Sequence, residues 1–251
     1  MGFKCGIVGL PNVGKSTLFN ALTASKNAEA ANFPFCTIDP NIGIVDVVDE
    51  RLDQLTKLSN SKKKIYTNIT FVDIAGLVKG ASKGEGLGNK FLSHIREVDA
   101  IIHLVRCFES DKITHVNSKI NPVDDLETIK TEIILSDLDI IQKKLEKGKK
   151  KLLEEKEIKI LEDKLKQLND GKEVIANDKN EEKFLNTLGL LSIKPKIIVC
   201  NVDEESVAKG NSFTESVKKN YSEEKVVTIC ADIEDQIMSL DKKERETFMK
   251  E

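Results

Sequence analysis

The sequence lacks three features that would each assign it to a broad class of proteins. Its formal net charge is only -3, so any contact with nucleic acid must be local, and no sequence-specific DNA binding is expected. Its five cysteines are odd in number, far apart and without metal-ligand spacing, which favours a reduced protein over a disulfide scaffold. No apolar run approaches the roughly 18 residues of a membrane span, and no basic and apolar leader opens the chain. These absences predict a soluble protein of the cytoplasm.

Apolar runs of strand length are present instead, and helix-like segments separate them. The runs cover residues 3–8, 42–48, 65–74, 100–105, 196–200 and 225–229. This alternation is typical of an α/β fold in which helices cover both faces of a mostly parallel central sheet. At 251 residues the chain is long enough for one such domain with an insertion.

The alternation is interrupted between residues 123 and 189, where no strand pattern occurs. Apolar residues recur there at spacings of three and four, at Ile134, Leu138, Ile141 and Leu145, and then at Ile158, Leu161, Leu165 and Leu168. The spacing predicts two amphipathic helices in a coiled-coil-like hairpin that bends near residues 147–151. We therefore expect one domain from residues 1–122 and 190–251, and a helical insertion from 123–189. Lysines and glutamates on its outer positions form either a solvated face or a docking surface for an acidic partner such as RNA.

A phosphate-binding motif directly follows the first predicted strand. Residues 9–16 match the pattern GxxxxGK[ST], and a helix-competent stretch begins at residue 17. In such a loop successive N–H groups turn toward one anion, and the helix N-terminus adds about half a positive charge. Lys15 is expected to bind the β- and γ-phosphates, and Ser16 to ligate Mg²⁺. The alternative is a glycine-rich turn without a ligand, and the flanking strand and helix argue against it.

A second motif, Asp73-Ile74-Ala75-Gly76, closes the third predicted strand. In P-loop enzymes a carboxylate at this place holds Mg²⁺ through water, and the glycine N–H can bond the γ-phosphate. Thr37, in the loop between the two motifs, is predicted to close on the metal while the γ-phosphate remains. The glycine-rich stretch 76–88 is predicted to sense bound nucleotide. An ordinary loop threonine and a flexible linker are the alternatives.

The residues Asn201-Val202-Asp203-Glu204 follow the fifth predicted strand, where Ras-type GTPases carry NKxD. In those proteins the lysine covers the base and the aspartate accepts two hydrogen bonds from guanine. Here Val202 replaces the lysine, and Glu204 replaces the aspartate with a side chain longer by one methylene, which spoils a bidentate geometry. We predict that adenine is preferred and guanine tolerated. Surface turn residues without a ligand are the alternative.

Together these motifs resemble the Obg-like ATPases, the YchF family of translation-factor-related P-loop proteins. The resemblance is carried by residues 1–22, 32–41, 71–89, 105–109 and 201–204, and it covers nearly the whole chain. It implies a G-domain fold interrupted by a helical insertion, ATP favoured over GTP, and association with ribosomes in translation or stress control. Two departures stand out. The small TGS domain usual in this family is absent from the sequence, and Cys230-Ala231 stand where many relatives have Ser-Ala near the base, which softens that contact.

The mechanism of hydrolysis must differ from that of Ras-like GTPases, because Leu77 stands where they place a water-orienting glutamine. The resemblance implies two substitutes. Asn12 would help to hold a K⁺ ion between the phosphates, and His115 would orient water or shuttle protons. An exposed loop histidine is the open alternative for His115, whereas His94 and His103 are expected to be structural.

These expectations define one site. The residues expected to contact the nucleotide are Asn12, Val13, Gly14, Lys15, Ser16, Thr17, Phe35, Gly76, Asn201, Val202, Glu204, Cys230 and Ala231. The expected metal ligands are Ser16, Thr37 and Asp73, and the expected catalytic residues are Asn12, Lys15, Leu77 and His115. The predicted function is slow ATP hydrolysis by a ribosome-associated regulator. A nucleotide sensor or GTPase whose hydrolysis is incidental to docking is the alternative; a metabolic kinase is disfavoured because no arginine-rich lid segment is present.

Overall fold

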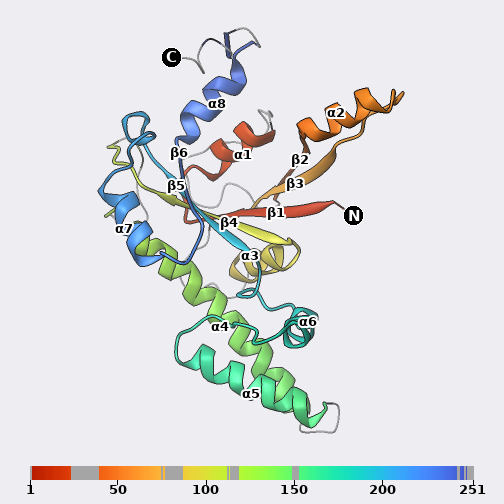
Figure 1. Ribbon diagram of the computed structural model, residues 1–251. Coiled ribbons are helices and arrows are strands. Elements are labelled where there is room, and N and C mark those ends of the chain that lie inside the picture. Colours follow the sequence, from red (N-terminus) through yellow and green to blue (C-terminus); the bar gives the residue numbers. More distant parts are fainter. Residues whose placement is uncertain are drawn as a thin grey trace.

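A six-stranded sheet forms the centre of the molecule (Figure 1). The computed structural model describes residues 2–23, 40–74, 76, 87–111, 113, 119–148, 153–241, 244, 245 and 247. The strands are β1 (Phe3–Val8), β2 (Asn41–Val47), β3 (Thr67–Asp73), β4 (Ala100–Arg106), β5 (Lys196–Asn201) and β6 (Val226–Ile229), in the spatial order β2-β3-β1-β4-β5-β6. Only the β2–β3 pair among them is antiparallel. The predicted α/β fold with a mostly parallel sheet is confirmed.

Helices cover both faces of this sheet (Figure 1). They are α1 (Lys15–Thr23), α2 (Glu50–Leu58), α3 (Leu87–Arg96), α4 (Pro122–Gly148), α7 (Ser212–Asn220) and α8 (Ala231–Ser239). α1 and α8 pack together on one face, α3, α4 and α7 lie on the other, and α2 projects with β2 and β3. Ile7 and Val8 in β1 are both fully buried, as expected for a strand covered on both sides.

The strand order predicts a ligand site at the carboxyl end of β1. β1 has β3 on one side and β4 on the other, and all three strands are parallel. The segments that come after these strands therefore meet at one edge of the sheet. After β1 the chain adds β2 and β3 on one side of that strand, and then β4, β5 and β6 on the other side. The point where the strand order reverses is a topological switch point, and α/β proteins bind their ligands at such points.

The helical insertion shares α4 with the sheet domain. At 27 residues and about 1.5 Å per residue, α4 is about 40 Å long. Its first half packs Ile129 and Ile133 into the core around the sheet, whereas Ile141 and Leu145 belong to a second hydrophobic core. α5 (Glu155–Asn169) lies against this second half and contributes Leu161, among others. The predicted helical hairpin is confirmed, while the domain limits at 122/123 and 189/190 stay a prediction.

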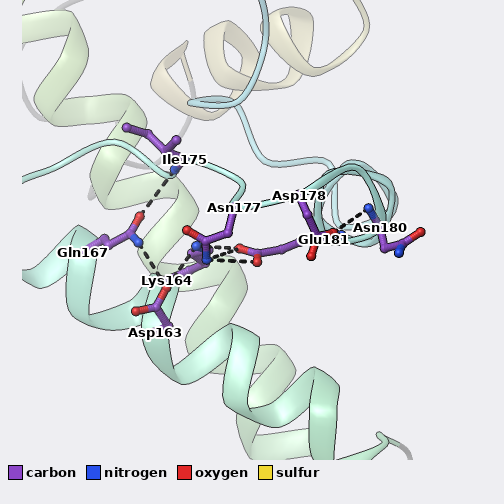
Figure 2. Close-up of polar contacts among 8 residues, drawn as sticks. All are labelled: Asp163, Lys164, Gln167, Ile175, Asn177, Asp178, Asn180 and Glu181. Atoms are coloured by element: carbon purple, nitrogen blue, oxygen red, sulfur yellow. Dashed lines mark hydrogen bonds and ion pairs between the residues drawn. The ribbon is translucent and has the colours of Figure 1, made fainter.

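A third helix of the insertion, α6 (Lys179–Thr187), was not predicted. It contributes Leu185 to the second core. Its connection to α5 is polar (Figure 2): the side chain of Lys164 is fully buried, and its Nζ lies 2.5 Å from Glu181 Oε1 on α6 and 2.9 Å from Asp163 Oδ2. Asn177 donates to Glu181 Oε2 at 3.0 Å. The buried ammonium group is thus compensated by two carboxylates, and it joins α5 to α6.

Two exclusions from the sequence can be compared with the structure. None of the helices within the described residues is long and apolar enough to cross a membrane. Cys5, Cys107, Cys200 and Cys230 are buried free thiols, as their scattered positions suggested. Cys36 lies outside the described residues.

Candidate nucleotide site

The loop after β1 has the backbone conformation that its glycines predicted. Asn12 and Gly14 have positive φ values of 61° and 97°. A Cβ atom at Gly14 would lie 2.5 Å from Nδ2 of Asn201, so a side chain here would collide with that amide group as well as strain the backbone. α1 begins at the next residue, and the amide of Leu18 donates to Gly14 O at 2.9 Å. The loop therefore leads directly into a helix N-terminus, which favours an anion.

Lys15 lies inside this loop, with only 8% of the residue exposed. Its Nζ donates to the carbonyl of Leu10 at 2.8 Å. Burial lowers the pKa of Lys15 to about 8, and the negative charge of Asp73 opposes that shift. A Cβ atom on Gly76 would lie 3.1 Å from the same Nζ, so the second motif closes over the lysine. A phosphate group bound here would supply the negative charge that the buried ammonium group needs.

Ser16 and Asp73 meet as the two motifs predicted. Ser16 Oγ donates to Asp73 Oδ2 at 2.9 Å, and Asp73 is buried. Burial raises the pKa of the Asp73 carboxyl, and the hydrogen bond from Ser16 opposes this. The pair therefore offers a hydroxyl oxygen for Mg²⁺ and, beside it, a carboxylate that can accept a hydrogen bond from one of the ion's water ligands, as the motif predicts.

Apart from Thr37, which lies outside the described residues, the remaining ligands of such an ion would be phosphate and water oxygens. Within the described part of the chain no group of three or more His, Cys, Asp or Glu residues is arranged to hold a metal. A small number of protein oxygens is usual for Mg²⁺ in nucleotide sites, because the phosphates of the substrate and water molecules supply the other ligands.

Asn201 braces the phosphate loop to the segment expected to hold the base. Its Nδ2 donates to the carbonyl of Val13 at 3.0 Å, and its Oδ1 accepts from the amide of Ala231 at 2.9 Å. Asn201, Val13 and Ala231 are all buried. The side chain therefore holds two loops in a fixed relation.

The other residues predicted near the base lie around this brace. Val202 is buried, and it belongs to the same hydrophobic cluster as Cys200 and Val217. Glu204 is exposed at the start of the short helix η1 (Glu204–Ser206). Burial raises the pKa of the Cys230 thiol, hydrogen bonds with the backbone of Ile233 and Asp232 oppose this shift, and the negative charges of Asp232 and Glu204 add to it. The structure thus brings Glu204, Cys230 and Ala231 to one end of the site.

The structure does not describe every residue predicted for the site. Thr17 lies on α1 and is partly buried. Phe35, Thr37, Leu77 and His115 lie outside the described residues, so their roles stay predictions.

Sequence reasoning missed Arg106, which ends β4 and is 1% exposed. Its guanidinium group donates from Nε to Phe108 O at 3.1 Å, from Nη1 to Ile113 O at 2.9 Å and from Nη2 to Ser110 O at 3.3 Å. The available signal was an arginine directly after a buried apolar run at the carboxyl edge of the sheet. Hydrophobic periodicity identifies apolar core positions, so it does not indicate what a buried arginine contacts.

A phosphate loop, a buried lysine and a serine–aspartate pair at the switch point of a parallel sheet together define a P-loop nucleoside triphosphatase. A family model described as "50S ribosome-binding GTPase" matches residues 4–202. The ribosome-binding ATPase YchF of Bacillus subtilis (strain 168) is 47% identical over 264 aligned residues, and that of Escherichia coli O157:H7 is 49% identical over 262. Both alignments cover 100% of this chain and 71% of the relative.

A solved structure is similar over the same extent. The Schizosaccharomyces pombe YchF GTPase matches with a TM-score of 0.80 and 34% identity, covering 99% of this chain and 71% of that one. The chain therefore belongs to the YchF family of Obg-like ATPases. The resemblance drawn from the motifs is confirmed.

Proposed function

We propose that this protein binds ATP with Mg²⁺ at the carboxyl edge of its sheet, hydrolyses it slowly and tolerates GTP. The observation that carries the proposal is the grouping of buried Lys15 and Asp73 with partly buried Ser16 at the phosphate loop. It combines one fixed positive charge, one hydroxyl and one carboxylate, which are the groups that a Mg²⁺-triphosphate requires.

Ser16 and Asp73 would hold the Mg²⁺ ion, with Thr37 as the predicted third protein ligand. Bound Mg²⁺ neutralises charge on the phosphate oxygens. The protein's own contribution is positional: Lys15 binds the β- and γ-phosphates as a point charge, and amide groups of residues 12–17 and 76 surround them. Because Lys15 is already held by Leu10 O, little reorganisation is needed when the phosphates arrive.

The preference for adenine is supported by the two substituted positions after β5. Val202 is buried among apolar side chains, so the aliphatic stem and charge that cover a guanine ring in Ras-type proteins are missing. Glu204 is exposed, and its longer side chain does not reproduce the bidentate geometry of an aspartate. A base held mainly by Asn201, Cys230, Ala231 and Phe35 would be recognised weakly at its edge, which allows both purines.

Hydrolysis without a water-orienting glutamine at position 77 requires other groups. In this proposal His115 orients the attacking water, and Asn12 helps to hold a K⁺ ion that neutralises charge between the phosphates. The chemistry is then slow unless a partner completes the site.

A ribosome or ribosomal subunit is the proposed partner, and the cytoplasm the proposed location. The two bacterial relatives described above carry the name ribosome-binding ATPase. The alternative function is a GTPase or nucleotide sensor whose hydrolysis is incidental to docking. It is supported by the description of the family model and by the name of the fission yeast protein, since both contain the word GTPase.

The test is an equilibrium titration with fluorescent ATP and GTP analogues in Mg²⁺, followed by ribosome co-sedimentation in each nucleotide state. We expect tighter binding of ATP, near loss of binding in Lys15→Ala, and sedimentation that depends on the nucleotide. Tighter binding of GTP would favour the alternative function. Binding of neither purine nucleotide would refute both.

Single-turnover hydrolysis tests the catalytic roles. His115→Ala should lower turnover more than affinity, and exchange of K⁺ for Na⁺ at constant ionic strength should slow the wild-type protein. Turnover unaffected by either change would remove the corresponding group from the mechanism. Comparing rates with and without ribosomes separates a partner-activated enzyme from a sensor.

A further inference from the structure

We propose that the end of α2 and the turn after it form a docking surface for the phosphate backbone of ribosomal RNA. This surface, the basic tip, consists of residues 57–64. Its role rests on the proposed function, since the ribosome is the partner proposed there, and it assigns the contact to one part of the chain. The phosphate, metal and base groups of the nucleotide site take no part in it.

α2 contributes no side chain to the interior of the protein. None of its nine residues is buried, and Leu55 and Leu58 are 57% and 82% exposed. The helix projects from the sheet at the β2 edge, away from the insertion (Figure 1). A helix that covers no core and exposes apolar side chains indicates a surface for a partner.

The charge of the basic tip is of one sign. It contains Lys57, Lys62, Lys63 and Lys64 but no acidic residue, and every one of its residues is exposed. Lys64 forms an ion pair with Asp53, one turn before Lys57 on α2. In the described part of the chain Lys62 and Lys63 have no hydrogen bond or ion pair, and Lys57 interacts with Asp53 through charge alone. Because Lys64 already neutralises Asp53, three positive charges remain for a partner of opposite sign.

The turn that carries these lysines has a defined backbone. The amide of Ser61 donates to Thr56 O at 3.1 Å, which closes the turn at the end of α2. Asn60 has a φ of 49°, a left-handed conformation that asparagine adopts more readily than most residues. On the far side of the turn Tyr66 Oη donates to Asp53 Oδ1 at 2.8 Å and fastens the returning chain to the helix. A preformed turn loses less conformational entropy when a partner binds.

Among acidic macromolecules RNA fits this surface best. Its backbone offers closely spaced negative charges to a projecting tip, and its sugars offer an aliphatic surface to exposed Leu58. An anionic bilayer would instead face the whole length of α2. Asp49 and Glu50, which lie at the start of that helix, would then be repelled by the lipid headgroups.

Two triple variants that lose the same charge test this role. The tip variant combines Lys57→Gln, Lys62→Gln and Lys63→Gln, and the control variant combines Lys156→Gln, Lys159→Gln and Lys166→Gln on α5. The helix α5 carries as many acidic residues as lysines, so it presents no surface of one sign. All six positions are exposed, so both variants should fold and bind fluorescent ATP like the wild type.

Binding to protein-free ribosomal RNA is measured by fluorescence anisotropy over a series of KCl concentrations, and binding to whole ribosomes by co-sedimentation. Each lysine-to-phosphate contact adds about 0.7–0.9 to the slope of log K against log salt, so the tip variant should lose roughly two to three units of slope. At about 0.1 M KCl its affinity for RNA and for ribosomes should fall roughly ten- to a hundred-fold. The control variant should change little in either measurement.

Equal RNA affinity of the tip variant and the wild type would overturn the docking role while leaving the proposed function intact. A loss for ribosomes but not for protein-free RNA would assign the tip to a ribosomal protein. Binding of the wild type to phosphatidylglycerol vesicles but not to RNA would assign it to a membrane, and either result overturns the RNA contact. A wild type that binds ATP but neither ribosomes nor RNA would overturn the proposed partner as well. A loss of affinity and slope confined to the tip variant would support the docking role.

Discussion

Replacing Asn201 by alanine should weaken both the fold and nucleotide binding, because one side chain serves two loops. The amide group donates to Val13 O at 3.0 Å and accepts from Ala231 N at 2.9 Å. Val13 and Ala231 are fully buried, so water does not readily replace the lost partner. The substitution would leave one acceptor and one donor of the backbone unsatisfied.

The magnitude can be worked out from these two groups. An unsatisfied buried polar group costs about 1–3 kcal/mol, so the pair gives a loss of about 2–6 kcal/mol in the free energy of unfolding before relaxation. For a domain of this size 1 kcal/mol corresponds to about 2–4 °C in Tm. Even the lower limit of about 2 kcal/mol therefore predicts a fall in Tm of roughly 4 °C or more. That free energy is a substantial part of a typical stability of about 5–15 kcal/mol.

The assay is thermal unfolding of wild type, Asn201→Ala and Asp203→Ala, each with and without ATP and Mg²⁺. Asp203 is the matched control because its exposed side chain only caps η1, accepting from Ser206 N at 2.9 Å. ATP should raise the Tm of wild type and of Asp203→Ala alike, and raise that of Asn201→Ala less, since the loops that bind ATP are no longer held together. A Tm for Asn201→Ala within 1 °C of wild type, in the range of about 0.5 kcal/mol or less, would refute the brace.

Two further predictions concern buried charges. In the nucleotide-free protein, burial lowers the pKa of Lys15 to about 8, so the side chain is mostly neutral above that pH. Bound phosphate favours the charged lysine, and nucleotide binding above pH 8 should therefore be accompanied by uptake of a proton. ATP affinity should therefore be constant below pH 8 and fall as pH rises beyond it, and calorimetry in two buffers of different ionisation enthalpy should detect the proton; equal heats would contradict this. Glu181→Gln, which removes the main counter-charge of Lys164, should lower the stability of the insertion by about 3 kcal/mol in urea unfolding. Its effect should largely disappear when Lys164→Met is added, and persistence in that double variant would disprove the pairing.

The sheet and the phosphate end of the site could be predicted from the sequence because their causes are local. Central strands such as β1 and β4 are largely buried and appear as unbroken apolar runs. All six strands were predicted close to their limits, although β2 is largely exposed. The phosphate loop needs glycine at fixed places, and Gly14 illustrates why, since any Cβ there would collide with Asn201. Such steric requirements leave a mark on the sequence itself.

Features that depend on long-range polar contacts could not be predicted in this way. Arg106 bonds to carbonyls, and every residue type offers a carbonyl, so no pattern reveals its partners. α6 was missed for a different reason: it has few apolar residues, so periodicity is weak. Its N-terminus did carry a signal, because Asp178 accepts from the amides of Asn180 and Glu181, and an aspartate followed three residues later by a glutamate is typical of a helix start.

The junction between the insertion and the sheet shows how these two kinds of information combine. Periodicity reveals that α4 is apolar on one side, but not that the same helix enters two cores. At the crossing point Asp137 is fully buried and accepts from Leu191 N at 2.8 Å and Ser192 N at 2.9 Å, and Arg96 Nη2 of α3 donates to Ser136 Oγ at 2.6 Å. Moving the insertion about this point would leave the Asp137 carboxylate buried without donors, at a cost of several kcal/mol. We therefore expect the insertion to move with α3, which begins at the end of the glycine-rich stretch predicted to sense nucleotide, rather than to swing independently of the nucleotide site.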